Sequence, residues 1–305
     1  MGENEPDSKT DLVDLPLCAL HVMEAGEGPP LIIVPATISE LENWVELVRF
    51  MGQWFRTYFF ELPGHGQSTP LPAAFTSDLV AGAVGQLADH IGAQRFSLMG
   101  FSFGGILAMK TFLLLRQRID SVIFISPCVT GRALLLTRPQ RFAASQLNRL
   151  LKIPSIRSFL YKAAQNKTNA RRLARLVHVV GKVENYREFE SRLAKMRPSM
   201  IEIVSRELDE ILGAEFPLPE SKYETPCHFA MSVNDPVLHY RTTLDALRSQ
   251  FLNVRVTELS FRFHQPPRAF TLDELNHSFR DTLAESLLRG PRSGDTPGQA
   301  QFPKP

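Results

Sequence analysis

The chain has 305 residues, of which 44% are hydrophobic, and its 34 lysines and arginines nearly balance its 32 aspartates and glutamates. This length can bury a large core, and the balanced charge argues against wholesale nucleic-acid binding. The three widely spaced cysteines predict neither a disulfide framework nor a zinc cluster, and the lack of an apolar leader or of a stretch of roughly 18 apolar residues predicts a cytoplasmic protein.

Short β-branched or aromatic runs alternate with longer helical patterns along most of the chain, as in a parallel sheet covered by helices. Strands are expected near residues 17–24, 30–35, 56–61, 95–101, 121–126, 227–233 and 254–260. Helices are expected at about 41–54, 75–92, 103–118, 242–251 and 272–288. The runs LIIV and VIFIS are almost entirely apolar, which is typical of central strands buried on both faces. We therefore predict an α/β fold with a mostly parallel sheet and helices on both faces.

The alternation stops after Pro127, and the pattern stays helical until about residue 222. Roughly 95 residues of helix between two strands exceed an ordinary crossover, so we predict an inserted helical lid. The chain then divides into a disordered N-terminus at 1–11, a first core part at 12–127, the lid at 128–222, a second core part at 223–288 and a disordered tail at 289–305.

The sequence GFSFGG begins at Gly100, where a β-like run gives way to a helical one. A strand that turns sharply into a helix strains the turning residue, and small residues two before and two after it relieve the crowding. Gly100 and Gly104 hold those places around Ser102. The helix would also direct its positive end toward the serine, while the flanking Phe101 and Phe103 are expected to pack beneath the turn. The motif predicts a nucleophilic serine.

With this motif the chain resembles the α/β-hydrolase superfamily, in particular its lidded single-domain serine esterase-like members, over about residues 17–288. Three further blocks follow the family's order: LIIVPATISELENW at 31–44, YFFELPGHGQS at 58–68 and CHFAMSVNDPV at 227–237. In the first block Trp44 keeps the family's register, whereas Pro35 and Ala36 replace a His-Gly pair.

The resemblance implies a catalytic triad in the order serine, acid, histidine. A serine hydroxyl needs a base to accept its proton and a carboxylate to orient that base. By position the nucleophile is Ser102, the acid is Asp235 and the base is His264, which follows the last predicted strand. The backbone N–H groups of Phe103 and Thr37 would form the oxyanion hole.

Other assignments stay open for the acid and the base. Asp235 also fits an Asx-type turn, because it lies in the sequence NDP. Among the eight histidines, His239 lies only four residues after Asp235 and is read as a loop residue. His277 falls inside the final predicted helix, and His65 in PGHG is expected to organise its own turn.

The predicted lid is strongly basic. Between Cys128 and Val183 the chain has 12 lysines and arginines and no acidic residue. Such a lid favours an anionic partner, either an acyl-CoA or acyl-carrier thioester or an anionic lipid surface. The alternative is a solvated face that complements the acidic remainder. Nucleic acid is not expected because few aromatic residues lie among the basic ones, and some of the lid's apolar residues would line an acyl pocket.

We therefore expect a serine hydrolase without metal or organic cofactor, which cleaves an ester or thioester of a mostly apolar acyl group as a small-molecule substrate. A non-catalytic binding protein of the same fold is the alternative, since Pro35 has no N–H and Ser232 and the pair Arg262-Phe263 stand where the family has small residues. An acyltransferase, a carbon–carbon hydrolase or a cofactor-free haloperoxidase would use the same triad. The oligomeric state is not predicted.

Overall fold

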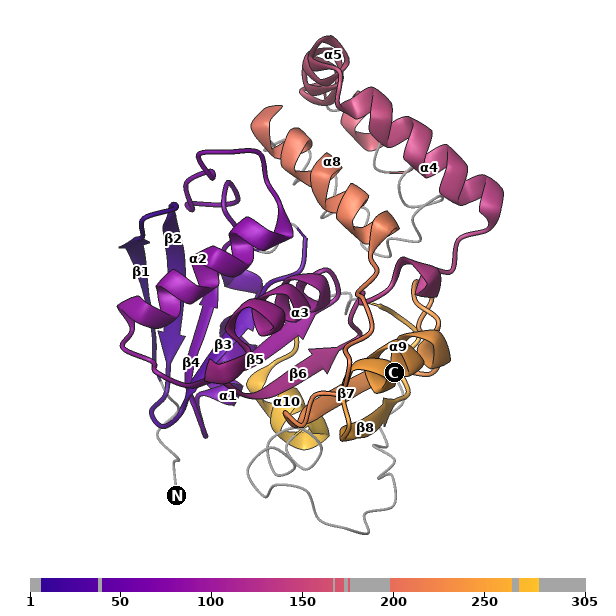
Figure 1. The fold of residues 1–305 in the computed structure, drawn as a ribbon. Helices are drawn as coiled ribbons and strands as arrows, with labels where there is room; N and C mark the ends of the chain where they lie inside the picture. Colours follow the sequence, from indigo (N-terminus) through magenta and orange to yellow (C-terminus); the bar gives the residue numbers. More distant parts are fainter. Residues whose placement is uncertain are drawn as a thin grey trace.

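The structure is a computed structural model that describes residues 7–37, 40–166, 168–172, 175, 198–264 and 269–279. Its centre is an eight-stranded sheet in the order β1-β2-β4-β3-β5-β6-β7-β8 (Figure 1). The strands are β1 (Ser8–Asp14), β2 (Ala19–Ala25), β3 (Pro30–Val34), β4 (Arg56–Phe60), β5 (Phe96–Phe101), β6 (Ile119–Ile125), β7 (Cys227–Ser232) and β8 (Val254–Leu259). The run from β4 through β8 is parallel, and β1 and β2 are antiparallel. All seven predicted strands are confirmed, within two residues at each end.

Strand β1 corrects the prediction of a disordered N-terminus, because residues 8–11 lie in it. It pairs with β2 along its whole length, from Ser8 opposite Ala25 to Asp14 opposite Ala19. Most of its side chains are exposed, and Val13 is its one buried residue. This edge strand is therefore held by backbone hydrogen bonds, which a hydrophobic pattern does not reveal.

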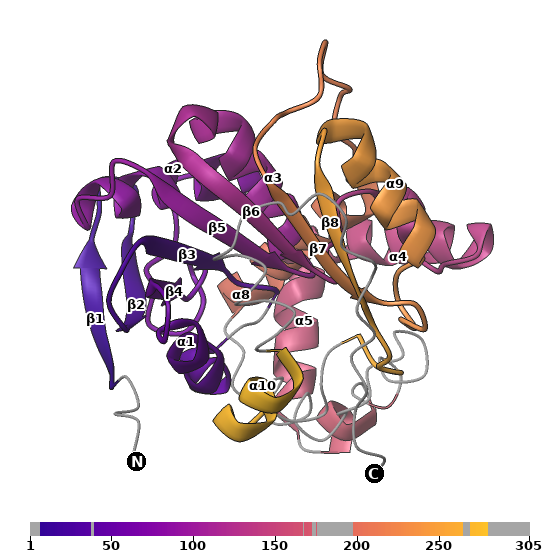
Figure 2. The same cartoon turned by 90° about the horizontal axis from the view of Figure 1, so that it is seen from below.

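Helices cover both faces of the sheet (Figure 2). One face carries α1 (Val45–Met51) and α10 (Leu272–Phe279), and the other carries α2 (Ser77–His90), α3 (Gly104–Leu115) and α9 (Tyr240–Gln250). Short 3-10 turns η1 (Leu41–Asn43) and η2 (Arg116–Arg118) complete two of the predicted helices, and the predicted part after residue 279 lies outside the described residues.

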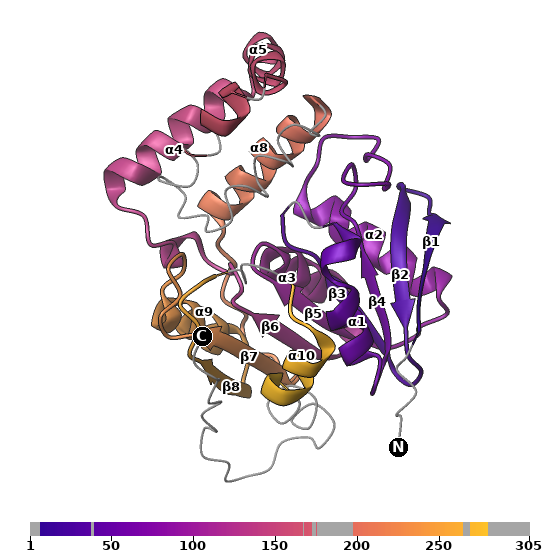
Figure 3. The same cartoon turned by 180° about the vertical axis from the view of Figure 1, so that it is seen from behind.

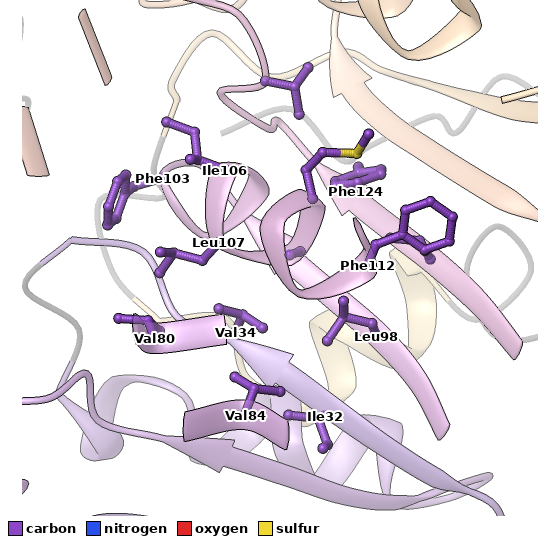
Figure 4. Packing of buried hydrophobic residues seen from close by; sticks show 14 of the residues in the cluster. Ile32, Val34, Val80, Val84, Leu98, Phe103, Ile106, Leu107, Phe112 and Phe124 are labelled. Atoms are coloured by element: carbon purple, nitrogen blue, oxygen red, sulfur yellow. The ribbon is translucent and has the colours of Figure 1, made fainter. Parts of the chain in front are cut away.

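Successive residues of a central strand enter two separate cores. In β3, Ile32 packs with α2 and α3, whereas Leu31 and Ile33 pack with α1 on the opposite side, and all three are fully buried. Figure 4 shows the first core, with Leu98 of the neighbouring strand between β3 and α3. Burial on both faces explains why the runs LIIV and VIFIS are so apolar. The sheet is thus a rigid support for residues at its strand ends.

Between β6 and β7 the chain forms η3 (Gly131–Ala133), α4 (Arg138–Leu151), α5 (Pro154–Ala164) and α8 (Pro198–Gly213). Figure 3 shows the three helices grouped at one end of the molecule, with α8 between α4 and the core. Much of the predicted lid between α5 and α8 lies outside the described residues, so the lid stays a prediction. Among the helices that the structure describes, none has both the length and the apolar character needed to cross a bilayer.

Candidate active site

Ser102 connects β5 to α3 in a strained backbone conformation. Its φ is 51°, in the left-handed region that serine rarely adopts. Three backbone hydrogen bonds hold it: Ser102 N donates to the Ile125 carbonyl (3.2 Å), and the Ser102 carbonyl accepts from the N–H groups of Gly105 (2.9 Å) and Cys128 (2.8 Å). Strain of this kind persists only where the surroundings fix it, and it is concentrated at functional sites. The predicted sharp turn is present.

The glycines of the motif are required by close packing. A Cβ atom on Gly100 would lie 2.4 Å from the carbonyl oxygen of Gly104. One on Gly104 would lie 2.4 Å from the carbonyl oxygen of Val34, and one on Gly105 would lie 2.6 Å from Pro127 Cβ. Side chains do not reach such distances, so α3 approaches β5 and β3 this closely only with glycine at these positions.

The structure brings the three predicted triad residues together. His264 Nε2 lies 2.7 Å from Ser102 Oγ, and His264 Nδ1 lies 2.8 Å from Asp235 Oδ2. Both distances are within the reach of proton transfer. The Asp235 side chain is fully buried and that of His264 is 11% exposed. With Nδ1–H donating to the carboxylate, Nε2 is free to accept the serine proton.

Asp235 also forms the turn that the sequence allowed as an alternative. Its second oxygen, Oδ1, accepts hydrogen bonds from the N–H groups of Val237 (2.8 Å) and Leu238 (2.9 Å). The two oxygens are therefore divided between the turn and His264, so Asp235 can form the turn and contact the histidine at the same time.

Two positioning contacts were missed by the sequence analysis. The first is Phe101, whose ring stacks on that of His264 at 5.9 Å between centroids and meets that of Trp44 edge-on at 5.6 Å. The expectation that Phe101 packs beneath the turn is wrong, whereas Phe103 is 1% exposed and does so. Phe101 ends β5 and contacts Trp44, which packs on the α1 side of the sheet with Met99, whereas Phe103 packs in the core with α2 and α3. The alternation of side chains along β5 is the sequence signal that could have shown this difference.

The second missed contact is made by Ser232, at the end of β7. Its hydroxyl donates to the carbonyl oxygen of Phe261 and accepts from the N–H group of Asn234 (3.1 Å). Ser232 is 1% exposed. Because Phe261 lies three residues before His264, this hydroxyl ties the loop of the acid to the segment of the histidine. The residue that departs from the family pattern thus links two parts of the site.

The predicted oxyanion donors lie next to the serine turn. The Phe103 N–H group precedes the first turn of α3, where backbone N–H groups have no acceptor within a helix. Thr37 lies in the loop after β3, and Gly104 is in close contact with the carbonyls of Val34 and Pro35 at the start of this loop. The loop therefore runs along the serine turn even though Pro35 has replaced the family's histidine.

The remaining candidates have structural contacts elsewhere. The ring of His239 accepts from the N–H group of Thr242 (3.3 Å) as the N-cap of α9, and His277 lies on α10. No cluster of three or more histidine, cysteine, aspartate or glutamate side chains suited to a metal ion occurs in the described part of the chain.

A second pair of ionisable side chains is buried where α8 meets the PGHG turn. His65 Nε2 lies 3.5 Å from Glu207 Oε1, and their side chains are 1% and 0% exposed. Burial lowers the pKa of His65 from 6.5 to about 4 and raises the pKa of Glu207 from 4.5 to about 8. At neutral pH both groups are therefore uncharged in the folded protein, and the side chain of His65 lies against Glu207 of α8.

We expect the free energy of unfolding to fall as the pH rises from about 6.5 to about 8. In this range the unfolded chain has lost the Glu207 proton that the folded protein keeps, so deprotonation favours unfolding by at most about 2 kcal/mol. Between pH 4.5 and 6.5 the change in the pKa of His65 has the opposite effect on the free energy of unfolding and offsets that of Glu207.

Urea denaturation between pH 6.5 and 8 measures the slope of the free energy of unfolding against pH. Glu207→Gln should remove it, whereas Glu215→Gln, at an exposed position, should not; an unchanged slope in Glu207→Gln would contradict the assignment.

Comparison with known proteins places the fold. A family model described as alpha/beta hydrolase fold matches residues 29–199, more than half of the chain, and the protein belongs to this family. Two solved structures have a similar fold. An epoxide hydrolase from Bacillus megaterium is 15% identical with a TM-score of 0.63, and the match covers 85% of this chain and 95% of that one. A 2-hydroxy-6-oxo-6-phenylhexa-2,4-dienoate hydrolase from Rhodococcus is 17% identical with a TM-score of 0.57, and the match covers 85% of this chain and 92% of that one. At these identities they support the fold alone.

The curated relatives are named as enzymes with different activities. A pimeloyl-[acyl-carrier protein] methyl ester esterase of Nitrosomonas europaea is 26% identical over 122 residues, which are 38% of this chain and 45% of the relative. The dihydrolipoyllysine-residue acetyltransferase component of an acetoin cleaving system from Cupriavidus necator is 28% identical over 132 residues, 43% of this chain and 35% of the relative. The chain thus spans less than half the length of these relatives. The protein is therefore a member of the α/β-hydrolase family, and its relatives include esterases.

Proposed function

We propose that the protein is a serine hydrolase that cleaves a carboxylic ester or thioester of a mostly apolar acyl group through an acyl-enzyme. One observation carries the proposal: the continuous relay from Ser102 Oγ through His264 to Asp235, with distances of 2.7 and 2.8 Å. The esterase among the relatives supports the reaction type. The partly exposed side chains beside the relay, Phe101 and Trp44, are aromatic, which favours an apolar acyl group.

In the first half-reaction Ser102 Oγ attacks the acyl carbonyl carbon while His264 Nε2 takes the hydroxyl proton. The carbonyl oxygen becomes negatively charged, and the N–H groups of Phe103 and Thr37 would donate to it. Asp235 stabilises the imidazolium that forms, and Phe101 stacked against the same ring adds a favourable cation–π contact. When the tetrahedral intermediate collapses, the bond to the leaving oxygen or sulfur breaks and His264 returns the proton to it.

The second half-reaction repeats these steps with water. His264 Nε2 removes a proton from the water as its oxygen attacks the acyl-enzyme carbonyl. The ester bond to Ser102 then breaks, and the serine oxygen recovers the proton from His264. The products are a carboxylic acid and the free enzyme, so the cycle needs no metal or organic cofactor.

An acyltransferase is the second candidate, because one relative is named as an acetyltransferase component. In that reaction an alcohol, thiol or amine replaces water in the second half-reaction at the same site. Product analysis with an added acceptor separates the two: a hydrolase gives free acid throughout, and a transferase gives the acylated acceptor.

A fluorophosphonate probe tests the proposal directly. We expect covalent labelling of the wild-type protein at Ser102, located by peptide mass spectrometry, and none of Ser102→Ala. Ser126→Ala is the matched control and should leave labelling intact, since Ser126 directly follows β6 as Ser102 follows β5, and its φ is also positive. A folded wild-type protein that stays unlabelled would instead favour a non-catalytic binding protein. A panel of p-nitrophenyl esters and acyl-CoAs of increasing chain length then defines the acyl group.

A further inference from the structure

Helices α4 and α5 expose large apolar side chains to solvent. Three of them lie on α4, namely Phe142 (67% exposed), Leu147 (58%) and Leu150 (48%), while Ile153 (42%) lies between the two helices and Phe159 (70%) on α5. Single exposed apolar residues are common on protein surfaces, but a group of them in consecutive helices marks an interaction site. We refer to these five residues as the apolar face of α4–α5.

The opposite side of α4 is polar and buried. Asn148 is 1% exposed, and its amide nitrogen donates to the Ser205 carbonyl (2.8 Å) and to Asp209 Oδ1 (2.7 Å) of α8. The Ser205 hydroxyl donates back to Asn148 Oδ1 (2.7 Å). A helix that packs on a water-soluble core normally turns its apolar side inward. Helix α4 has the reverse orientation, with its polar side against the protein.

Ion pairs add to these contacts between α8 and the helices α4 and α5. Lys152 Nζ lies 2.5 Å from Asp209 Oδ2, and Arg157 Nη1 of α5 lies 2.7 Å from Glu202 Oε2. Both acidic residues belong to α8, whose Ile203 packs into the core cluster on another side of the helix. Helix α8 therefore separates α4 from the core, as Figure 3 shows. The apolar face of α4–α5 is held outward by specific polar contacts.

Basic side chains border the apolar face. Arg138 precedes Phe142 by one helical turn, Arg149 adjoins Leu150, and Lys162 follows Phe159 by three residues. All three basic residues are exposed, and no ion pair is recorded for them within the described residues. The absence of any acidic residue between Cys128 and Val183 leaves this region positively charged. Apolar and basic side chains side by side are the pattern of helices that lie in a membrane interface.

The charge of this region also distinguishes between two possible partners of the apolar face, a second copy of the chain and a lipid surface. A second copy of the chain would meet it through a two-fold axis and set the same basic residues against each other. An anionic lipid surface instead attracts every one of them and accepts the phenylalanine and leucine side chains among its acyl chains. We infer that the apolar face of α4–α5, with Arg138, Arg149 and Lys162, docks the protein on anionic phospholipid membranes.

The test uses full-length Ser102→Ala, which removes any hydrolysis of the lipid. We expect it to co-sediment with phosphatidylcholine vesicles that contain phosphatidylglycerol at least about tenfold more strongly than with phosphatidylcholine alone, and to be released by salt. In this background, replacing both Phe142 and Phe159 with serine should weaken binding about tenfold or more. The replacements Arg138→Glu and Arg149→Glu together should remove the preference for the anionic vesicles.

Matched controls are available elsewhere on the surface. Leu114 of α3 is 59% exposed and Arg241 of α9 is exposed, so Leu114→Ser and Arg241→Glu should bind like the parent. Equal sedimentation with both vesicle types, no sedimentation, or equal losses in the controls would overturn the inference. So would a dimer in light scattering that Phe142→Ser dissociates. Because the vesicle assay needs no active serine, its failure leaves the hydrolase proposal standing, and the reverse also holds.

Discussion

Asp235→Asn is expected to lower kcat about ten-thousandfold, because it reverses the proton on His264. Asparagine can place its amide nitrogen where Oδ2 now lies, 2.8 Å from His264 Nδ1. An N–H group there donates to Nδ1 and moves the imidazole proton to Nε2, which then cannot accept the Ser102 proton. The side-chain oxygen can still accept from the N–H groups of Val237 and Leu238, so the turn and the fold are retained.

Initial rates with a p-nitrophenyl ester, fitted for kcat and KM, check this expectation. KM should change little, since the carboxylate is fully buried and does not contact the substrate. Asp245→Asn, at an exposed position of α9, is the matched control and should keep the wild-type kcat. A loss smaller than about tenfold in Asp235→Asn would remove this residue from the relay.

The central strands could be predicted because burial on both faces leaves an apolar run in the sequence, as in β3 and β6. Strand β1 was not readable, since its stability comes from backbone pairing with β2 and its side chains face water. The positions of Ser102, Asp235 and His264 followed from a motif and its chain order. Their meeting depends on strand ends of one parallel sheet, which the order of elements already implies.

The supporting contacts were less predictable for a physical reason. The Ser232 hydroxyl reaches the Phe261 carbonyl only because β7 and β8 are adjacent, with Ser232 opposite Leu259. Likewise, the basic charge of α4 and α5 could be predicted from the composition, but the side of α4 that packs inward could not. That choice depends on Ser205 and Asp209 of α8, more than 50 residues further along the chain. Hydrogen bonds between distant segments leave no local pattern in a sequence.

Gly104→Ala is expected to reduce the free energy of unfolding by about 3 kcal/mol, because the added methyl group meets backbone atoms that cannot move independently. Its carbon would lie 2.4 Å from the Val34 carbonyl oxygen and 2.7 Å from that of Pro35. Val34 is fully buried at the end of β3, which is paired on both sides by β4 and β5. Relief therefore requires shifting α3 away from the sheet, since β3 has no free edge.

The same shift should also lower activity, because Phe103 is the N-cap of α3 and its N–H group would move away from Thr37, which follows the fixed strand β3. Urea denaturation followed by circular dichroism gives the stability, and the ester assay gives kcat on the folded fraction. Gly213→Ala is the matched control: it ends α8, an added methyl group meets no atom within 4 Å, and we expect it to be neutral or stabilising by about 0.5 kcal/mol. If Gly104→Ala were as stable and active as Gly213→Ala, the close contact between α3 and β3 would not be what positions Ser102.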